Sequence, residues 1–116
     1  MKYLLILNDP PYGTERSYNG LRLAMSLCKQ EDTELCLFLM ADSVGCAKAA
    51  QKTPSGYYNI ERMIKSLAQR KVPIGACKSC MDARGLMETE LIEGVRKSSM
   101  DELTDWTIWA DKVIVF

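Results

Sequence analysis

Histidine is absent from this sequence. Because histidine is the commonest general base and the commonest neutral metal ligand in proteins, its absence excludes Ser-His and Cys-His catalysis. An excess of charge is also missing, since 15 lysines and arginines balance 15 aspartates and glutamates. That balance argues against a nucleic-acid-binding face or a polybasic membrane surface, and it is compatible with self-assembly.

Long hydrophobic runs are missing too. The N-terminal run from Lys2 to Leu7 is short and ends at Asn8-Asp9-Pro10-Pro11, with no small-residue cleavage site of the kind that follows a signal peptide. No other stretch approaches the roughly 20 apolar residues that span a bilayer. We therefore expect a soluble protein with no membrane partner that stays in the cytoplasm.

Cysteine is present in an odd number, five, so complete pairing within the chain is impossible. Cys28, Cys36 and Cys46 lie in apolar periodic segments, where cysteine usually behaves as a small hydrophobic residue. Such usage is typical of a reducing compartment, which agrees with the expected cytoplasmic location.

Apolar runs and segments of helical periodicity alternate along the whole chain. The runs that predict strands are Lys2 to Leu7, Glu34 to Met40, Pro73 to Ala76 and Lys112 to Phe116. Near-continuous apolar strands separated by helices predict an α/β protein with a mostly parallel sheet and helices on both faces. No repeat, low-complexity segment or long linker interrupts the pattern, which predicts one domain over residues 1–116.

Local signals predict where the helices begin and end. Thr14 is the expected N-cap of the first long helix, the clearest helix begins after Asn59, and Ser99 with Glu102 predicts a capping box for the last helix. The segment from Ser79 to Glu93 predicts helix in one or two pieces, with a break at Gly85.

The most specific motif is Cys77-Lys78-Ser79-Cys80, which directly follows the third predicted strand. A sulfur at a strand-to-helix junction can face unpaired backbone N–H groups and the positive end of a helix, which favour thiolate over thiol. Cys80 lies one helical turn further on, where it could resolve a mixed disulfide or a persulfide. Ser79 competes with Cys77 for the cap position, and that choice decides which sulfur is better activated.

Three interpretations of this cysteine pair remain open. It is a redox dithiol or a sulfur-carrying thiol, it contributes to a structural zinc site, or its members only pack and cap. The zinc interpretation needs four ligands, whereas the sequence has no second CxxC and no histidine. No metal site is therefore expected.

Other candidate residues follow from the topology, because ligands of open parallel sheets bind beyond the carboxyl ends of the strands. The loop from Asn8 to Gly13, the residues after the second strand, and the cysteine motif with the Arg-Gly pair behind it fall there. The candidate binding residues in these segments are Asn8, Asp9, Tyr12, Asp42, Arg84 and Gly85. The first loop is poor in glycine and lacks the spacing of a phosphate loop, so no nucleotide or other cofactor is expected.

Five segments carry a resemblance to a known family. They are Asn8 to Gly13 with Arg16 and Leu21 to Ala24, Phe38 to Val44, Cys77 to Leu86, Gly94-Val95 with Ser99-Met100, and Ala110 to Phe116. On these residues the chain resembles the DsrE/DsrF-like family, close to its stand-alone YchN-like branch, essentially from end to end. The block from Cys77 through Arg84-Gly85 is the most specific of the five.

The resemblance implies a three-layer α/β/α fold with a five-stranded parallel sheet of order 4-3-2-1-5. The strand missing from the pattern above would be a short edge strand near Gly94-Val95-Arg96. The resemblance also implies homotrimers or hexamers. In the sulfur-relay branch of the family a cysteine carries sulfur as a persulfide and passes it to a partner's cysteine, and the spacing transfers that role to Cys77.

The leading hypothesis is thus a sulfur-handling protein, possessing a sulfurtransferase-like activity or acting as a carrier, in which Cys77 holds a persulfide and Cys80 resolves it. Its partners would be a sulfur donor protein and an acceptor protein. The alternative is a non-catalytic oligomeric protein that binds a small ligand or a partner, with incidental thiols.

Overall fold

Five parallel strands form a single sheet in the computed structural model, which describes residues 1–116. The strands are β1 (Lys2–Leu7), β2 (Glu34–Leu39), β3 (Ile74–Cys77), β4 (Val95–Ser98) and β5 (Lys112–Val115). Their order across the sheet is β4-β3-β2-β1-β5, and every neighbouring pair is parallel. The predicted order is confirmed, and β4 is the short edge strand expected near Gly94-Val95-Arg96.

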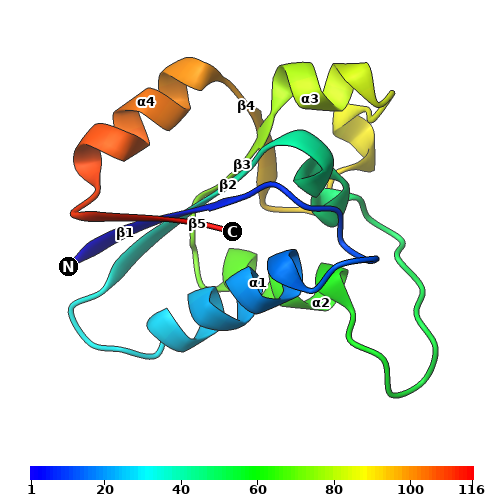
Figure 1. The fold of residues 1–116 in the computed structure, drawn as a ribbon, viewed down its shortest axis with the longest axis horizontal. Helices are drawn as coiled ribbons and strands as arrows, with labels where there is room; N and C mark the ends of the chain where they lie inside the picture. The colour runs from blue at the N-terminus through cyan, green and yellow to red at the C-terminus, as the bar shows by residue number, and fades with distance from the viewer.

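Helices cover both faces of this sheet, so the molecule has three layers (Figure 1). The helices are α1 (Arg16–Leu27), α2 (Ile60–Gln69), α3 (Lys78–Ala83) and α4 (Met100–Trp109), with two 3₁₀ helices, η1 (Ala41–Ala47) and η2 (Glu88–Glu90). Figure 1 shows α1 and α2 side by side below the sheet, and α3 and α4 above it. None of the helices has the length and apolar character that a bilayer crossing requires.

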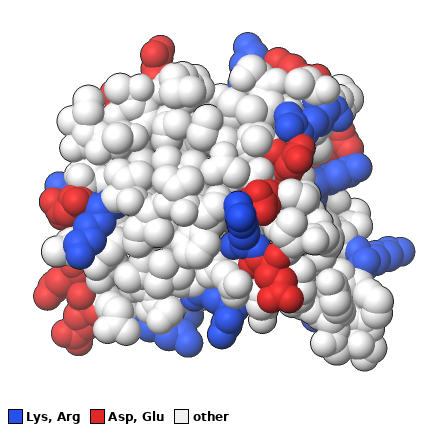
Figure 2. All heavy atoms as spheres, in the orientation of Figure 1, with Lys and Arg blue, Asp and Glu red and all other residues white.

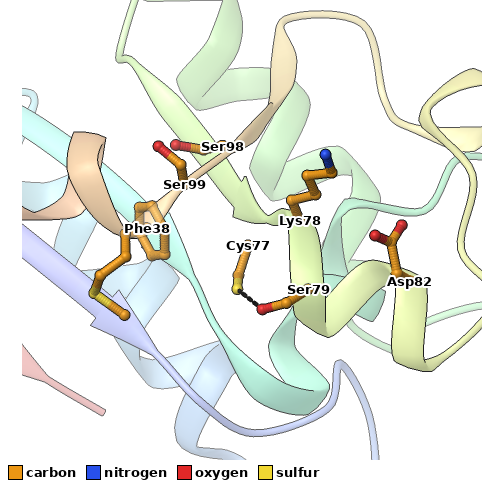
Figure 3. A pocket seen from close by; sticks show the side chains of 8 residues that line it. Phe38, Cys77, Lys78, Ser79, Asp82, Ser98 and Ser99 are labelled. Atoms are coloured by element: carbon orange, nitrogen blue, oxygen red, sulfur yellow. Dashed lines mark hydrogen bonds between the residues drawn. The ribbon is translucent and has the colours of Figure 1, made fainter.

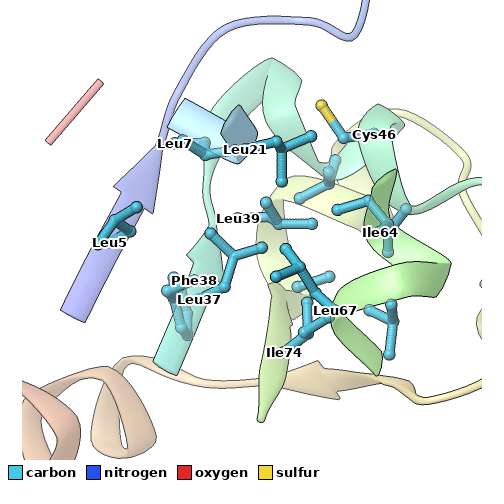
Figure 4. Packing of buried hydrophobic residues seen from close by; sticks show 14 of the residues in the cluster. Leu5, Leu7, Leu21, Leu37, Phe38, Leu39, Cys46, Ile64, Leu67 and Ile74 are labelled. Atoms are coloured by element: carbon cyan, nitrogen blue, oxygen red, sulfur yellow. The ribbon is translucent and has the colours of Figure 1, made fainter. Parts of the chain in front are cut away.

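The core forms where the apolar runs of the central strands meet the helix faces (Figure 4). β1 and β2 are buried from both sides, which explains why their sequences are apolar without alternation. From below, α2 contributes Ile60, Ile64 and Leu67, all fully buried and spaced along one helix face. This packing fixes the sheet, and with it the loops that follow the carboxyl ends of the strands.

The helix starts agree only in part with the expectations. Thr14 is not an N-cap, because its hydroxyl donates to the Asp9 carboxylate at 2.8 Å and α1 begins only after Glu15. Ser99 caps α4 by accepting from the Glu102 N–H at 3.3 Å. The reciprocal half of the capping box is missing, since the Glu102 carboxylate binds Arg96 and Ser98 instead.

The segment from Ser79 to Glu93 contains much less helix than expected. α3 ends at Ala83, and the only other helical piece is the single 3₁₀ turn η2. Gly85 has a positive φ of 65° and donates to the Asp82 carbonyl, while Leu86 donates to the Met81 carbonyl. This pair of hydrogen bonds is a Schellman motif, with Leu86 and Met81 both buried beneath it. Gly85 is thus the residue that allows the chain to leave α3.

Candidate thiol site at the end of strand β3

Cys77 lies at the junction of β3 and α3, where it is both the last residue of the strand and the N-cap of the helix. Its side chain is only 7% exposed. It lines a cavity of about 260 Å³ whose other wall residues are Phe38, Lys78, Ser79, Asp82, Ser98, Ser99 and Met100. The sulfur therefore faces a cavity in the surface rather than the sealed interior (Figure 3).

Hydrogen-bond donors around Cys77 favour its ionised form. Burial by itself would raise the pKa of the thiol, but hydrogen bonds from the Ser79 hydroxyl, from the backbone N–H and thiol of Cys80, and from the backbone N–H of Ser79 outweigh it and lower the pKa. The Ser79 hydroxyl oxygen is 3.3 Å from the Cys77 sulfur. The structure thus answers the question of the cap: Cys77 occupies the position, and Ser79 turns toward its sulfur.

Cys80 has the opposite acidity. Burial and the hydrogen bond that its thiol donates to Cys77 raise its pKa, and they outweigh the Ala41 N–H, which donates to the Cys80 sulfur at 3.2 Å. The surroundings of the pair thus favour the thiolate at Cys77 and the thiol at Cys80. An attacking thiolate beside a protonated thiol is the arrangement that thiol chemistry at a CxxC pair requires.

Lys78 does not take part in this activation. Its ammonium group points away from the Cys77 sulfur (Figure 3), and it is not among the groups that lower the thiol pKa. The acidity of Cys77 comes from hydrogen bonds at the start of α3 rather than from a neighbouring cation.

Asp42 and Arg84 form a second cluster behind α3. Two guanidinium nitrogens contact Asp42 Oδ1, Nη2 at 2.8 Å and Nε at 2.9 Å, and Nη1 donates to the Cys80 carbonyl at 3.1 Å. Together with Gly85 these side chains line a separate cavity of about 170 Å³. Arg84 therefore connects η1 to α3 and does not line the Cys77 cavity.

The side chains of Asn8, Asp9 and Tyr12 make their hydrogen bonds to residues other than Cys77 and Cys80. The Asn8 amide donates to the Phe116 carbonyl at 3.2 Å, and Asp9 accepts from the Thr14 hydroxyl at 2.8 Å. The Tyr12 hydroxyl donates to Gln51 at 2.9 Å and accepts from the Ile60 N–H at 3.1 Å, on the α2 side of the sheet. None of the three lines the Cys77 cavity.

Five wall residues outside the cysteine motif were not identified as site residues from the sequence: Phe38, Asp82, Ser98, Ser99 and Met100. Ser98 is paired directly with Cys77 across β3 and β4, and Phe38 reaches the cavity from β2. The sequence signal was the Ser98-Ser99 pair just before the last helix, which resembles an ordinary cap. Its relation to Cys77 depends on the β3–β4 pairing, which no local pattern revealed.

Metal-ligating side chains do not gather at the thiol pair. No three cysteine, aspartate or glutamate side chains in the structure converge on a point that could hold a metal ion. Of the remaining cysteines, Cys36 and Cys46 are buried and Cys28 is half-buried, each on another element. No third cysteine or carboxylate therefore lies beside the pair at ligand distance.

The sequence and the fold of this chain are similar to those of known proteins. The model of the DsrE/DsrF-like family matches residues 1–116. The chain is 43% identical to Protein YchN of Escherichia coli K12, over 99% of this chain and 98% of that protein. The crystal structure of the E. coli ychN protein superposes with a TM-score of 0.94 over the same shares. Sulfurtransferase TusD of Salmonella typhi is 24% identical over the full length of both chains.

Proposed function

Since the chain belongs to the DsrE/DsrF-like family, we propose that it is a sulfur-handling protein whose Cys77 carries sulfane sulfur as a persulfide. Family membership and the distant similarity to a sulfurtransferase support a sulfur-relay type of role. The proposal adds which atom bears the sulfur and how it is released. The partners in such a role are a protein that donates sulfur and a protein that accepts it.

The observation that carries the proposal is the contrast between the two sulfurs at the start of α3. Cys77 has a lowered thiol pKa and faces a cavity, and Cys80 has a raised thiol pKa one turn away. Because the thiolate is the nucleophile in sulfur transfer, Cys77 attacks and Cys80 follows. The hydrogen bonds that stabilise the thiolate also stabilise the terminal sulfur anion of a persulfide, where that anion remains within reach of the same donors.

Loading and release can be written with all atoms balanced. The Cys77 thiolate attacks the outer sulfur of a donor persulfide, R–S–S⁻, a Cys77 S–S bond forms, and the donor leaves as the thiolate R–S⁻. An acceptor thiolate then takes the outer sulfur and returns Cys77 to its thiolate. Alternatively, the Cys80 thiol gives its proton to the outer sulfur of the Cys77 persulfide and its sulfur attacks Cys77 Sγ, which closes a disulfide and releases the outer sulfur as HS⁻. A dithiol reductant must then restore both thiols.

Mass spectrometry tests the loading step. Reduced protein treated with a small persulfide, such as glutathione persulfide, should gain one sulfur atom on the peptide that contains Cys77. The Cys77→Ser variant should gain none there, whereas Cys80→Ser should keep the added sulfur longer than the unaltered protein. No added sulfur on either the wild-type protein or Cys80→Ser, or the same amount on Cys77→Ser, would exclude the proposal.

The alternative, a non-catalytic binding protein, remains distinguishable. It predicts ordinary thiol pKa values at both cysteines and no sulfur uptake. A specific observation favours assembly in either case. β5 is an edge strand whose Val113 and Val115 are exposed, and Ile108 of the preceding helix α4 is exposed as well. Figure 2 shows a broad uncharged area over the left part of one face, with charged side chains at its margins and in a band to the right of it.

We therefore propose that the protein works as a homo-oligomer, a trimer or a hexamer, and that the β5 edge contributes to the contact between copies. An exposed apolar edge strand is a ready template for pairing with another chain. All five cysteines are free thiols, and the proposed chemistry needs them reduced. A reducing compartment, the cytoplasm, is accordingly the proposed location.

A further inference from the structure

A groove rich in tyrosine lies on the opposite side of the sheet from the thiol site, between α1 and the start of α2. Its volume is about 450 Å³, within the range of roughly 300–1,000 Å³ that is typical of small-molecule sites. The residues that line it are Tyr18, Arg22, Met25, Ser26, Lys29, Tyr57, Tyr58, Asn59, Arg62 and Met63. We call this surface the tyrosine groove.

One wall of the tyrosine groove is a stack of aromatic rings. The Tyr58 ring centroid lies 4.2 Å from that of Tyr18 and 4.6 Å from that of Tyr57, and both pairs are stacked. Tyr12 supports the stack from behind, with its ring 5.6 Å from Tyr58 and its hydroxyl bonded to Gln51 and Ile60. Tyr57 is 50% exposed, so an aromatic surface held in place by its neighbours is open to solvent.

The charged side chains of the groove all have the same sign. Arg22, Lys29 and Arg62 line it, no aspartate or glutamate does, and none of the three cations is in an ion pair. The guanidinium of Arg22 lies over the Tyr18 ring, 5.6 Å from its centroid. In a chain with equal numbers of acidic and basic residues, three unpaired cations around one cavity are a local excess of positive charge.

We propose that the tyrosine groove binds a planar aromatic ligand that carries an anionic group, of which a nucleoside monophosphate is the simplest natural example. A flat ring stacks on the exposed Tyr57 ring, which Tyr58 supports from its other face, and such a contact suits any aromatic ring face. The phosphate lies among the cations, and Arg62 binds it with the planar guanidinium fork that matches phosphate oxygens. The thioethers of Met25 and Met63 offer an adaptable apolar surface between the two.

This binding mode differs from the phosphate loop whose absence was noted in the sequence. A phosphate loop holds phosphate by backbone N–H groups, whereas this groove offers side-chain cations and aromatic stacking. The site is independent of the thiol chemistry, because the cysteines and the groove lie on opposite faces of the sheet and share no wall residue.

A titration of isotope-labelled protein with AMP tests the proposal. AMP should shift the amide signals of α1 and of residues 57–63 in a saturable way and leave those of α3 unchanged. Adenosine alone and inorganic phosphate alone should each bind at least about tenfold more weakly than AMP, since each provides half of the contacts. Arg62→Gln should weaken AMP binding roughly threefold to tenfold, as should Tyr57→Ala.

The matched control is Arg70→Gln, which removes the exposed arginine at the C-cap of the same helix, α2, outside the groove. It should bind AMP like the unaltered protein. The proposal is overturned if AMP shows no saturable binding, if phosphate or adenosine binds as tightly, or if both arginine variants behave alike. It is also overturned if the same signals shift with protein concentration instead of AMP, since the groove would then be a contact between copies.

Discussion

Cys77 and Cys80 are the same residue type three positions apart, yet their sulfurs have different surroundings. The Cys77 sulfur accepts hydrogen bonds from groups at the start of α3. The Cys80 thiol is one of these donors, because it donates its own hydrogen bond to Cys77. The spacing of a CxxC motif brings the two sulfurs together, but only the hydrogen bonds decide which of the two thiols is more acidic. The order of reactivity is therefore a property of individual contacts, and it can be measured at single residues.

We predict that iodoacetamide alkylates Cys77 several times faster than Cys80 at neutral pH, although Cys80 is the more exposed. The alkylation rate of Cys77 should rise at a pH below the ordinary thiol value of about 8.5, because its pKa is lowered. The rate of Cys80 should rise above that value, because its pKa is raised. Peptide-resolved mass spectrometry across the pH range measures both profiles.

Cys28 is the internal control, since it is half-buried and burial raises the pKa of its thiol. It should react more slowly than Cys77 throughout. Superimposable profiles for Cys77 and Cys80 would contradict the ranking and weaken the assignment of the carrier sulfur.

Asp42 and Arg84 act between two helical elements, η1 and α3. The ion pair joins a residue of η1 to the end of α3, and Arg84 also holds the carbonyl of Cys80. The residue before Asp42 is Ala41, whose N–H donates to the Cys80 sulfur and whose φ of 50° lies in the left-handed region. The contact is thus positioned to hold the Cys80 sulfur against the Ala41 N–H.

We predict that Arg84→Gln moves the alkylation profile of Cys80 to higher pH and changes that of Cys77 less. Both the guanidinium charge and the Ala41 N–H lower the Cys80 pKa, so losing the charge and loosening the contact act in the same direction. The free energy of unfolding should fall by no more than about 1 kcal/mol, because the pair is exposed. Alkylation profiles and thermal unfolding measure the two effects.

Lys97→Gln provides the comparison for that variant. It breaks the 3.3 Å ion pair that joins Lys97 of β4 to Asp82 of α3, the helix that also contains Cys80. Equal Cys80 profiles in the two variants would show that Arg84 does not position the sulfur.

The whole molecule presents three different surfaces: the thiol cavity and the tyrosine groove on opposite faces, and an apolar edge at β5. The edge follows from the strand order, since β5 pairs with β1 alone. Because the net charge is zero, long-range repulsion between copies is weak. The thiol cavity and the tyrosine groove lie on the faces of the sheet and not at this edge, so assembly through β5 would leave both of them open in each copy.

We predict that the unaltered protein sediments as a homo-oligomer and that Val115→Lys shifts it to monomer. Val115 is 61% exposed on the edge strand, and a lysine there opposes edge pairing. Analytical ultracentrifugation measures the change. Met87→Lys, at a side chain that is 63% exposed on a loop, should leave the assembly intact. A monomeric wild type, or an oligomeric Val115→Lys, would contradict the role of this edge.

The amino-acid sequence by itself determined the alternation of strands and helices, the parallel sheet and the presence of a thiol pair after the third strand. These features are local, because an apolar run, a helical period or a CxxC spacing acts between residues close in the chain. The sequence pattern missed β4, because only Val95 and Ser98 of that edge strand are buried and its polar residues carry no apolar period.

The tertiary structure alone decided which sulfur is acidic, that Ser98 faces Cys77, and that Tyr12 joins Tyr58 rather than the thiols. It also decided that Arg84 binds Asp42. Each of these contacts, apart from the hydrogen bonds at Cys77 itself, joins segments separated by a strand or a helix. Their positions depend on how the helices that connect the strands pack against the sheet. That arrangement is decided by the packing of the whole hydrophobic core and not by any local segment.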